Sequence, residues 1–191
     1  MKTLVITGYK AKELGIFSNK DLKITIIKEA FKRKLIPLVE EGLEWVLLSG
    51  QPGIELWAAE VVVNLKDVFP IKLAIIPPFK EFDQYWSDGD KEIYQFIQQQ
   101  ADFNQLLYQR EYIGPFQFKQ RDEFFIHKSD GCLVLYDEDT HGSPHYFMKQ
   151  VEIMQNKGLD YKVMTITPFD LNEMAEDIVR ENPDFLKGKG N

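Results

Sequence analysis

The segment "SGQPGIE", residues 49–55, places two flexible glycines just before a carboxylate at the expected start of a helix. Gly50 and Gly53 allow a tight turn and a close approach of the backbone to a ligand. Free N–H groups and the positive end of the helix dipole at such a turn attract an anion. Glu55 would repel a phosphate placed on it, but it suits hydrogen bonds from ribose hydroxyls. We therefore expect phosphate on the amides and sugar on Glu55, the alternative being a plain helix start.

Two other polar loops follow expected strands. "TGYK", residues 7–10, comes after the first strand, and "YDEDTHGSPH", residues 136–145, comes after the fifth. The carboxyl ends of parallel strands lie on one edge of a sheet, so these loops should share one cleft with the glycine turn. Ser143 is expected to cap a helix that starts at Pro144. Lys10 is a candidate for offsetting a phosphate charge, with surface solvation as the alternative.

Aromatic side chains are the candidates for holding a base. Tyr85 and Trp86 lie in an expected loop and could stack on a base, with a small hydrophobic cluster as the alternative. Trp57 follows Glu55 by two residues in a helix, so the two side chains should point apart, and core packing is its alternative role.

Metal and thiol chemistry have little support in the sequence. The three histidines, at 127, 141 and 145, lack a zinc-type spacing, and residues 137–139 predict an exposed acidic turn. Cys132 is the single cysteine and lies in an apolar run, which predicts a buried, inert thiol and no intrachain disulfide. We expect no metal site.

Composition limits the classes of partner. The chain has 191 residues, enough to bury roughly 70% of the surface of the unfolded chain in one core. Its 23 Lys and Arg against 30 Asp and Glu give a net charge of −7, which disfavours binding to duplex nucleic acid. The start of the chain does not resemble a signal peptide, and no apolar run reaches 18 residues. We expect a cytoplasmic protein that does not enter a membrane.

Short apolar runs alternate with helical patterns along the chain. These patterns predict a three-layer α/β sandwich with a mostly parallel sheet, built as a single domain over residues 1–191. The expected strands are 3–7, 45–49, 71–76, 105–109, 131–136 and 162–166. The expected helices are 21–43, 54–66, 91–101, 116–127, 144–157 and 170–180.

Three stretches, "LVITGYK", "SGQPGIE" and "SDGCLVLYDEDTHGSP", resemble the YpsA family over essentially the whole chain. This family belongs to the SLOG superfamily of Rossmann-like proteins, with the DNA-processing protein DprA and the LOG phosphoribohydrolases. The resemblance implies a pocket for ADP-ribose, NAD or a nucleoside monophosphate. The residues it places around the ligand are Gly8, Tyr9, Lys10, Ser49, Gly50, Gly53, Glu55, Gly142 and Ser143. Our full set of candidates adds Gln51, Trp57, Tyr85, Trp86 and Asp137.

The sequence departs from the enzymes of this superfamily. LOG enzymes resemble one another through a Pro-Gly-Gly-x-Gly-Thr-x-x-Glu signature, and residues 51–55 lack its paired glycines and its threonine. The leading hypothesis is therefore a regulatory protein that binds a nucleotide-like ligand and acts through a protein partner. One alternative is a LOG-like hydrolase of N-glycosidic bonds with Glu55 as catalytic residue. Another is single-stranded nucleic-acid binding through Tyr85, Trp86, Lys119 and Arg121. A homodimer is also compatible with the aromatic content.

Overall fold

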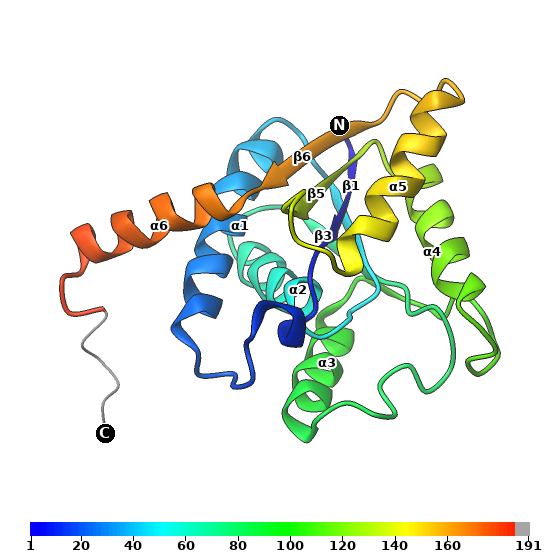
Figure 1. Cartoon of the computed structure of the whole chain (residues 1–191), viewed down its shortest axis with the longest axis horizontal. Helices are drawn as coiled ribbons and strands as arrows, with labels where there is room; N and C mark the ends of the chain where they lie inside the picture. Colours follow the sequence, from blue (N-terminus) through cyan, green and yellow to red (C-terminus); the bar gives the residue numbers. More distant parts are fainter. Residues whose placement is uncertain (186–191) are drawn as a thin grey trace.

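A computed structural model describes residues 1–185, within which six parallel strands form one sheet (Figure 1). The strand order is β4-β3-β2-β1-β5-β6, so the parallel α/β sheet predicted from the sequence is confirmed. The strands are β1 Thr3–Thr7, β2 Trp45–Leu48, β3 Lys72–Ile75, β4 Phe103–Asn104, β5 Gly131–Leu135 and β6 Lys162–Ile166.

Helices cover both faces of this sheet, which gives the expected three layers (Figure 1). One face carries α1 Leu22–Glu40, α2 Ile54–Leu65, α3 Asp88–Gln100 and α6 Pro168–Glu181, and the other carries α4 Phe116–His127 and α5 Ser143–Asn156. A short 3-10 helix, η1 Ala11–Leu14, follows β1.

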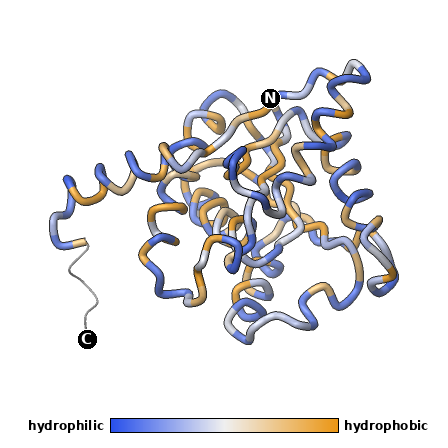
Figure 2. The backbone as a smooth tube through the Cα atoms, in the orientation of Figure 1, coloured by the Kyte–Doolittle hydropathy of each residue, from blue (hydrophilic) through white to orange (hydrophobic). Residues whose placement is uncertain are grey.

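The side chains of β1 alternate between the two hydrophobic cores. Leu4 and Ile6 pack in the larger core with α1 and α2, whereas Val5 packs in the smaller core with α4 and α5. Figure 2 shows hydrophobic residues along the strands and the inner faces of the helices, with polar residues toward the outside. Burial of β1 on both faces explains why its sequence is a continuous apolar run.

The expected strand 105–109 is wrong. Strand β4 is only Phe103–Asn104, paired with Ala74 and Ile75 of β3. Leu73 and Ile75 face β4, and the next residue on that side is Pro77, which has no backbone N–H to donate. The parallel ladder therefore ends soon after β3, although Leu107 N still donates to Pro77 O.

The strand order creates a crevice beside β1. The chain moves outward through β2, β3 and β4, and then returns to place β5 on the other side of β1. The loops after β1 and β5 therefore leave the sheet in opposite directions. In open parallel sheets, this switch point at the carboxyl ends of the strands is where ligands bind.

Candidate functional site

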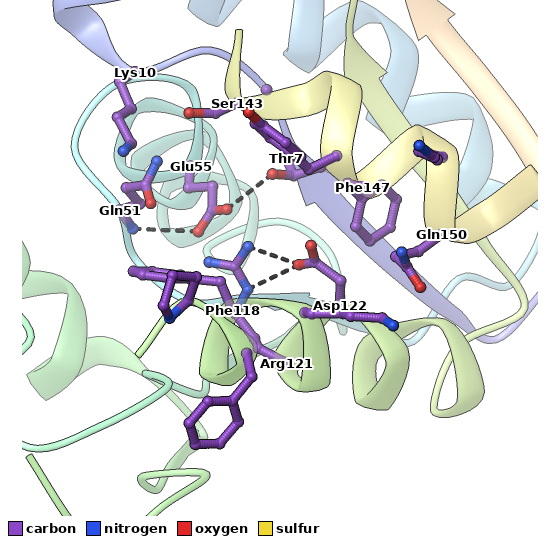
Figure 3. A pocket seen from close by; sticks show the side chains of 16 residues that line it. Thr7, Lys10, Gln51, Glu55, Phe118, Arg121, Asp122, Ser143, Phe147 and Gln150 are labelled. Carbon is purple, nitrogen blue, oxygen red and sulfur yellow. Dashed lines mark hydrogen bonds and ion pairs between the residues drawn. The ribbon is translucent and has the colours of Figure 1, made fainter. Parts of the chain in front are cut away.

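A cavity of about 450 Å³ lies at the carboxyl end of β1, between the start of α2 and the helices α4 and α5 (Figure 3). Its lining comes from segments far apart in the sequence, as expected for a switch-point crevice. The lining residues are Thr7, Gly8, Lys10, Gln51, Glu55, Pro115, Phe116, Phe118, Lys119, Arg121, Asp122, Ser143, Tyr146, Phe147, Lys149 and Gln150.

Glu55 lies in the first turn of α2, and only 4% of its surface is exposed. Its Oε2 accepts hydrogen bonds from the N–H groups of Ser49, Gly50 and Gln51 at 2.9, 3.0 and 3.2 Å. The same oxygen accepts from Ser49 Oγ at 2.6 Å, and Oε1 accepts from Thr7 Oγ1 at 2.9 Å. The amides that we expected to bind a phosphate therefore hold the chain's own carboxylate.

Gly53 joins the loop after β1 to the start of α2. It has φ 108°, and a Cβ added there would lie 2.5 Å from Ala11 N and 2.6 Å from Tyr9 O. Beside it, Ile54 N donates to Tyr9 O at 3.1 Å. Gly53 is thus needed for the contact between two backbone segments, whereas the sequence suggested the approach of a ligand.

A buried ion pair from α4 forms the floor of the cavity. Arg121 donates to Asp122 Oδ1 through Nε at 3.0 Å and through Nη2 at 2.6 Å. Arg121 Nη1 also donates to Ser49 Oγ at 3.3 Å, which links the pair to the residues around Glu55. Asp122 is 4% exposed and Arg121 is 9% exposed.

Asp122 and Glu55 both interact electrostatically with the guanidinium of Arg121. Burial alone would lower the pKa of Arg121, but the charges of Asp122 and Glu55 outweigh burial and raise it, so Arg121 stays protonated. Burial raises the pKa of Asp122, and the guanidinium of Arg121 opposes that shift. The charge of Glu55 pushes the pKa of Asp122 further upward.

The walls and the rim of the cavity differ from the floor. Aromatic rings from α4 and α5, those of Phe116, Phe118 and Phe147, line the walls. Lys10, Lys119 and Lys149 line the same cavity and are all exposed. An anionic group is therefore favoured at the rim, and an apolar or neutral group is favoured inside.

A second cavity of about 800 Å³ adjoins the first and shares Lys10, Gln51 and Phe118 with it. Its aromatic lining includes Phe79, Phe82, Tyr85, Trp86 and Tyr112. The ring of Trp86 meets that of Phe82 edge-on at 5.0 Å, so Trp86 belongs to a packed aromatic cluster as well as to the cavity. Tyr85 is 92% exposed at the edge of this cavity.

The start of α5 is also occupied by a carboxylate of the chain. Glu13 Oε1 accepts from Ser143 N at 3.0 Å and from Ser143 Oγ at 2.9 Å, while its Oε2 accepts from Lys10 N at 2.7 Å. The expected N-cap role of Ser143 is wrong, because Gly142 is the N-cap and the Ser143 hydroxyl donates to Glu13.

Three candidate residues have structural partners away from both cavities. The Tyr9 hydroxyl bonds to the backbone of Asp137 and Thr140, and 2% of Tyr9 is exposed. The carboxylate of Asp137 accepts from Thr140 Oγ1 and Asp139 N within its own turn. Trp57 is 4% exposed and packs in the larger core, which also contains Tyr9. Both side chains therefore stabilise the fold.

The structure thus brings together about half of the candidate set. Gly8, Lys10, Gln51, Glu55 and Ser143 line the first cavity. The second is lined by Lys10, Gln51, Tyr85 and Trp86. The candidates that line neither are Tyr9, Ser49, Gly50, Gly53, Trp57, Asp137 and Gly142.

Asp122 was not predicted from the sequence as a residue of the cavity, and Arg121 was considered only as a basic residue of a groove for single-stranded nucleic acid. A signal was present, because Phe118, Arg121, Asp122 and Phe125 follow the i, i+3, i+4, i+7 spacing of one helical face. Charged residues inside an apolar stripe must be paired when buried, which is a reason to suspect a site.

A sequence model of the YpsA family, described as the YspA SLOG family, matches residues 4–171, and the chain belongs to this family of Rossmann-like proteins. The relatives include the UPF0398 protein OB1025 of Oceanobacillus iheyensis, 44% identical over 97% of this chain and 99% of the relative. The UPF0398 protein YpsA of Bacillus subtilis is 46% identical over 93% of this chain and 98% of the relative.

Among solved structures, a similar chain is DNA processing protein A of Helicobacter pylori, studied for its single-stranded DNA binding mode. The TM-score is 0.48 at 14% identity, over 94% of this chain and 81% of that chain. In residues 1–185, no helix is long and apolar enough to cross a membrane.

Proposed function

We propose that this protein binds a nucleotide-derived ligand of the ADP-ribose or NAD type across the two adjoining cavities. The observation that carries the proposal is that the aromatic second cavity shares Lys10, Gln51 and Phe118 with the first cavity, whose aromatic walls enclose a charged floor. A ligand with a base, a diphosphate and a second sugar has the same order of chemical groups.

Each part of such a ligand has a matching region. The base lies in the second cavity, against the rings of Trp86 and Phe118. The diphosphate lies near Lys10, which lines both cavities and is exposed at their junction. The distal sugar enters the first cavity. The amides of residues 49–51 are not used, because Glu55 occupies them.

We expect Lys10→Ala to weaken the binding of ADP-ribose roughly fivefold, as for the loss of ~1 kcal/mol from a partly exposed charge pair. Isothermal titration calorimetry with AMP, ADP-ribose, NAD and a short single-stranded oligonucleotide tests this. The matched control is Lys20→Ala, which removes an exposed lysine that lines neither cavity. Absence of nucleotide binding by the unaltered protein would overturn the proposal, and binding of the oligonucleotide alone would favour the single-stranded nucleic-acid hypothesis.

Catalysis by Glu55 has less support than binding. A carboxylate that stabilises a sugar cation or activates water must be free to face the reacting atoms. Both oxygens of Glu55 already accept hydrogen bonds from the chain, five in total. We also propose a regulatory role in the cytoplasm, with the exposed Tyr112, Ile113 and Phe116 as the surface for a protein partner. Phe116 lines the first cavity and Tyr112 lines the second.

A further inference from the structure

Asp122 uses only one of its two carboxylate oxygens within the protein. Oδ1 accepts both hydrogen bonds from Arg121, whereas Oδ2 has no hydrogen-bond partner in the described part of the chain. All fully buried side-chain N and O atoms of residues 1–185 have a hydrogen-bond partner, so Oδ2 is not fully buried, and the space that Asp122 lines is the first cavity. Figure 3 shows this oxygen turned toward the space between Thr7 and Phe147.

The neighbours of Asp122 leave few other groups for a ligand to bond. Thr7 Oγ1 already donates to Glu55, and Arg121 donates its hydrogen bonds to Asp122 and Ser49. Gln150 lines the same cavity from α5, and its side chain is not bonded to any residue in the range 1–185. The interior thus offers one carboxylate oxygen, that of Asp122, and the side-chain amides of Gln51 and Gln150 between aromatic walls.

The charge balance restricts what this interior accepts. Glu55 and Asp122 are two acids against the one cation of Arg121, and all three are at least nine-tenths buried. A phosphate placed here would meet an excess of negative charge at low dielectric. A neutral group with hydroxyl donors would instead form a charge-assisted hydrogen bond with Asp122 Oδ2.

We propose that Asp122 is the specificity-determining residue of the site and accepts a hydrogen bond from a neutral, hydroxyl-bearing sugar at the far end of a diphosphate ligand. The proposal rests on the proposed nucleotide binding and assigns the sugar contact that we first gave to Glu55. It also sets the polarity of the ligand, with the sugar inside and the diphosphate at the lysine rim. A ligand that ends in a phosphate fits this cavity less well.

Calorimetric titration of ADP-ribose and of ADP into the unaltered protein and into Asp122→Asn tests this assignment. The unaltered protein should bind ADP-ribose about tenfold or more tightly than ADP, as for a hydrogen bond to a charged group. In Asp122→Asn this preference should disappear, because an amide replaces the anionic acceptor. Glu123→Gln is the control, since Glu123 is the next acid of α4 and does not line the cavity.

A second measurement does not depend on the folding of Asp122→Asn, which leaves Arg121 with a neutral partner. An ADP-ribose analogue without hydroxyls on its distal ring should bind the unaltered protein about tenfold more weakly than ADP-ribose. Equal affinities for the two, or a preference for ADP-ribose that survives in Asp122→Asn, would overturn the role of Asp122 while leaving nucleotide binding intact. If neither ADP-ribose nor ADP binds the unaltered protein, the proposed function itself is overturned.

Discussion

Glu55 stabilises the turn between β2 and α2 because it accepts hydrogen bonds from the backbone of the three residues that make the turn. Glu55→Gln should lower the free energy of unfolding by about 1.5–3 kcal/mol, since it removes the charge that these N–H groups bond. Urea unfolding followed by circular dichroism measures this loss. Glu60→Gln is the matched control on the same helix, because Glu60 only pairs with Lys28 near the surface. Unchanged stability of Glu55→Gln with lost ligand affinity would make Glu55 a ligand contact.

Gly53 allows a close contact between two backbone segments. Comparing its substitution with that of Gly158 separates the free-energy cost of a clash from the cost of placing an alanine at a positive φ. Gly53 and Gly158 both have positive φ, 108° and 93°, but a Cβ at Gly158 would have nothing within 4 Å. Gly158→Ala should therefore cost only the conformational term of about 1–2 kcal/mol. Gly53→Ala should lower the thermal midpoint clearly more, because its Cβ would clash with the backbone of Ala11 and Tyr9. Equal losses in the two variants would contradict this account.

At the scale of elements, Asp130 ties the start of β5 to the start of β1. Its Oδ2 accepts from Thr3 N at 2.9 Å and from Lys2 N at 2.6 Å, and these bonds lower its pKa below the ordinary 3.8. A lowered pKa in the folded state stabilises the fold above 3.8, and the stabilisation is lost as pH falls through the folded value. The stability difference between the unaltered protein and Asp130→Asn should therefore shrink below pH 3.8. Urea unfolding from neutral pH to about pH 2.5 measures it, and a constant difference would contradict the assignment.

The elements could be predicted where their pattern is local. The apolar run 3–7 and the helix 116–127 have the bounds expected from the sequence. The strand expected at 105–109 failed because its pairing depends on a neighbour that ends in Pro77 and Pro78, far away along the chain. Asp122 was missed for a similar reason, since its burial depends on α4 packing next to α5 and the sheet.

At the scale of the whole molecule, the site follows from the order of the strands. The sequence predicted that loops after β1, β2 and β5 share an edge, but it did not give the position of α4, which supplies Arg121 and Asp122. The whole chain has a net charge of −7. At the site, the positive charges of the lysines lie at the rim, and the negative charges of two acids lie on the floor. This arrangement is the one that the proposed ligand, with an anionic middle and a neutral end, would need.

The most direct test of the central claim is a crystal structure of the protein grown with ADP-ribose. We predict density for the base against Trp86 and Phe118, the diphosphate near Lys10, and a hydroxyl of the distal sugar within hydrogen-bonding distance of Asp122 Oδ2. Density for a phosphate on the amides of residues 49–51, with Glu55 displaced from them, would contradict the account.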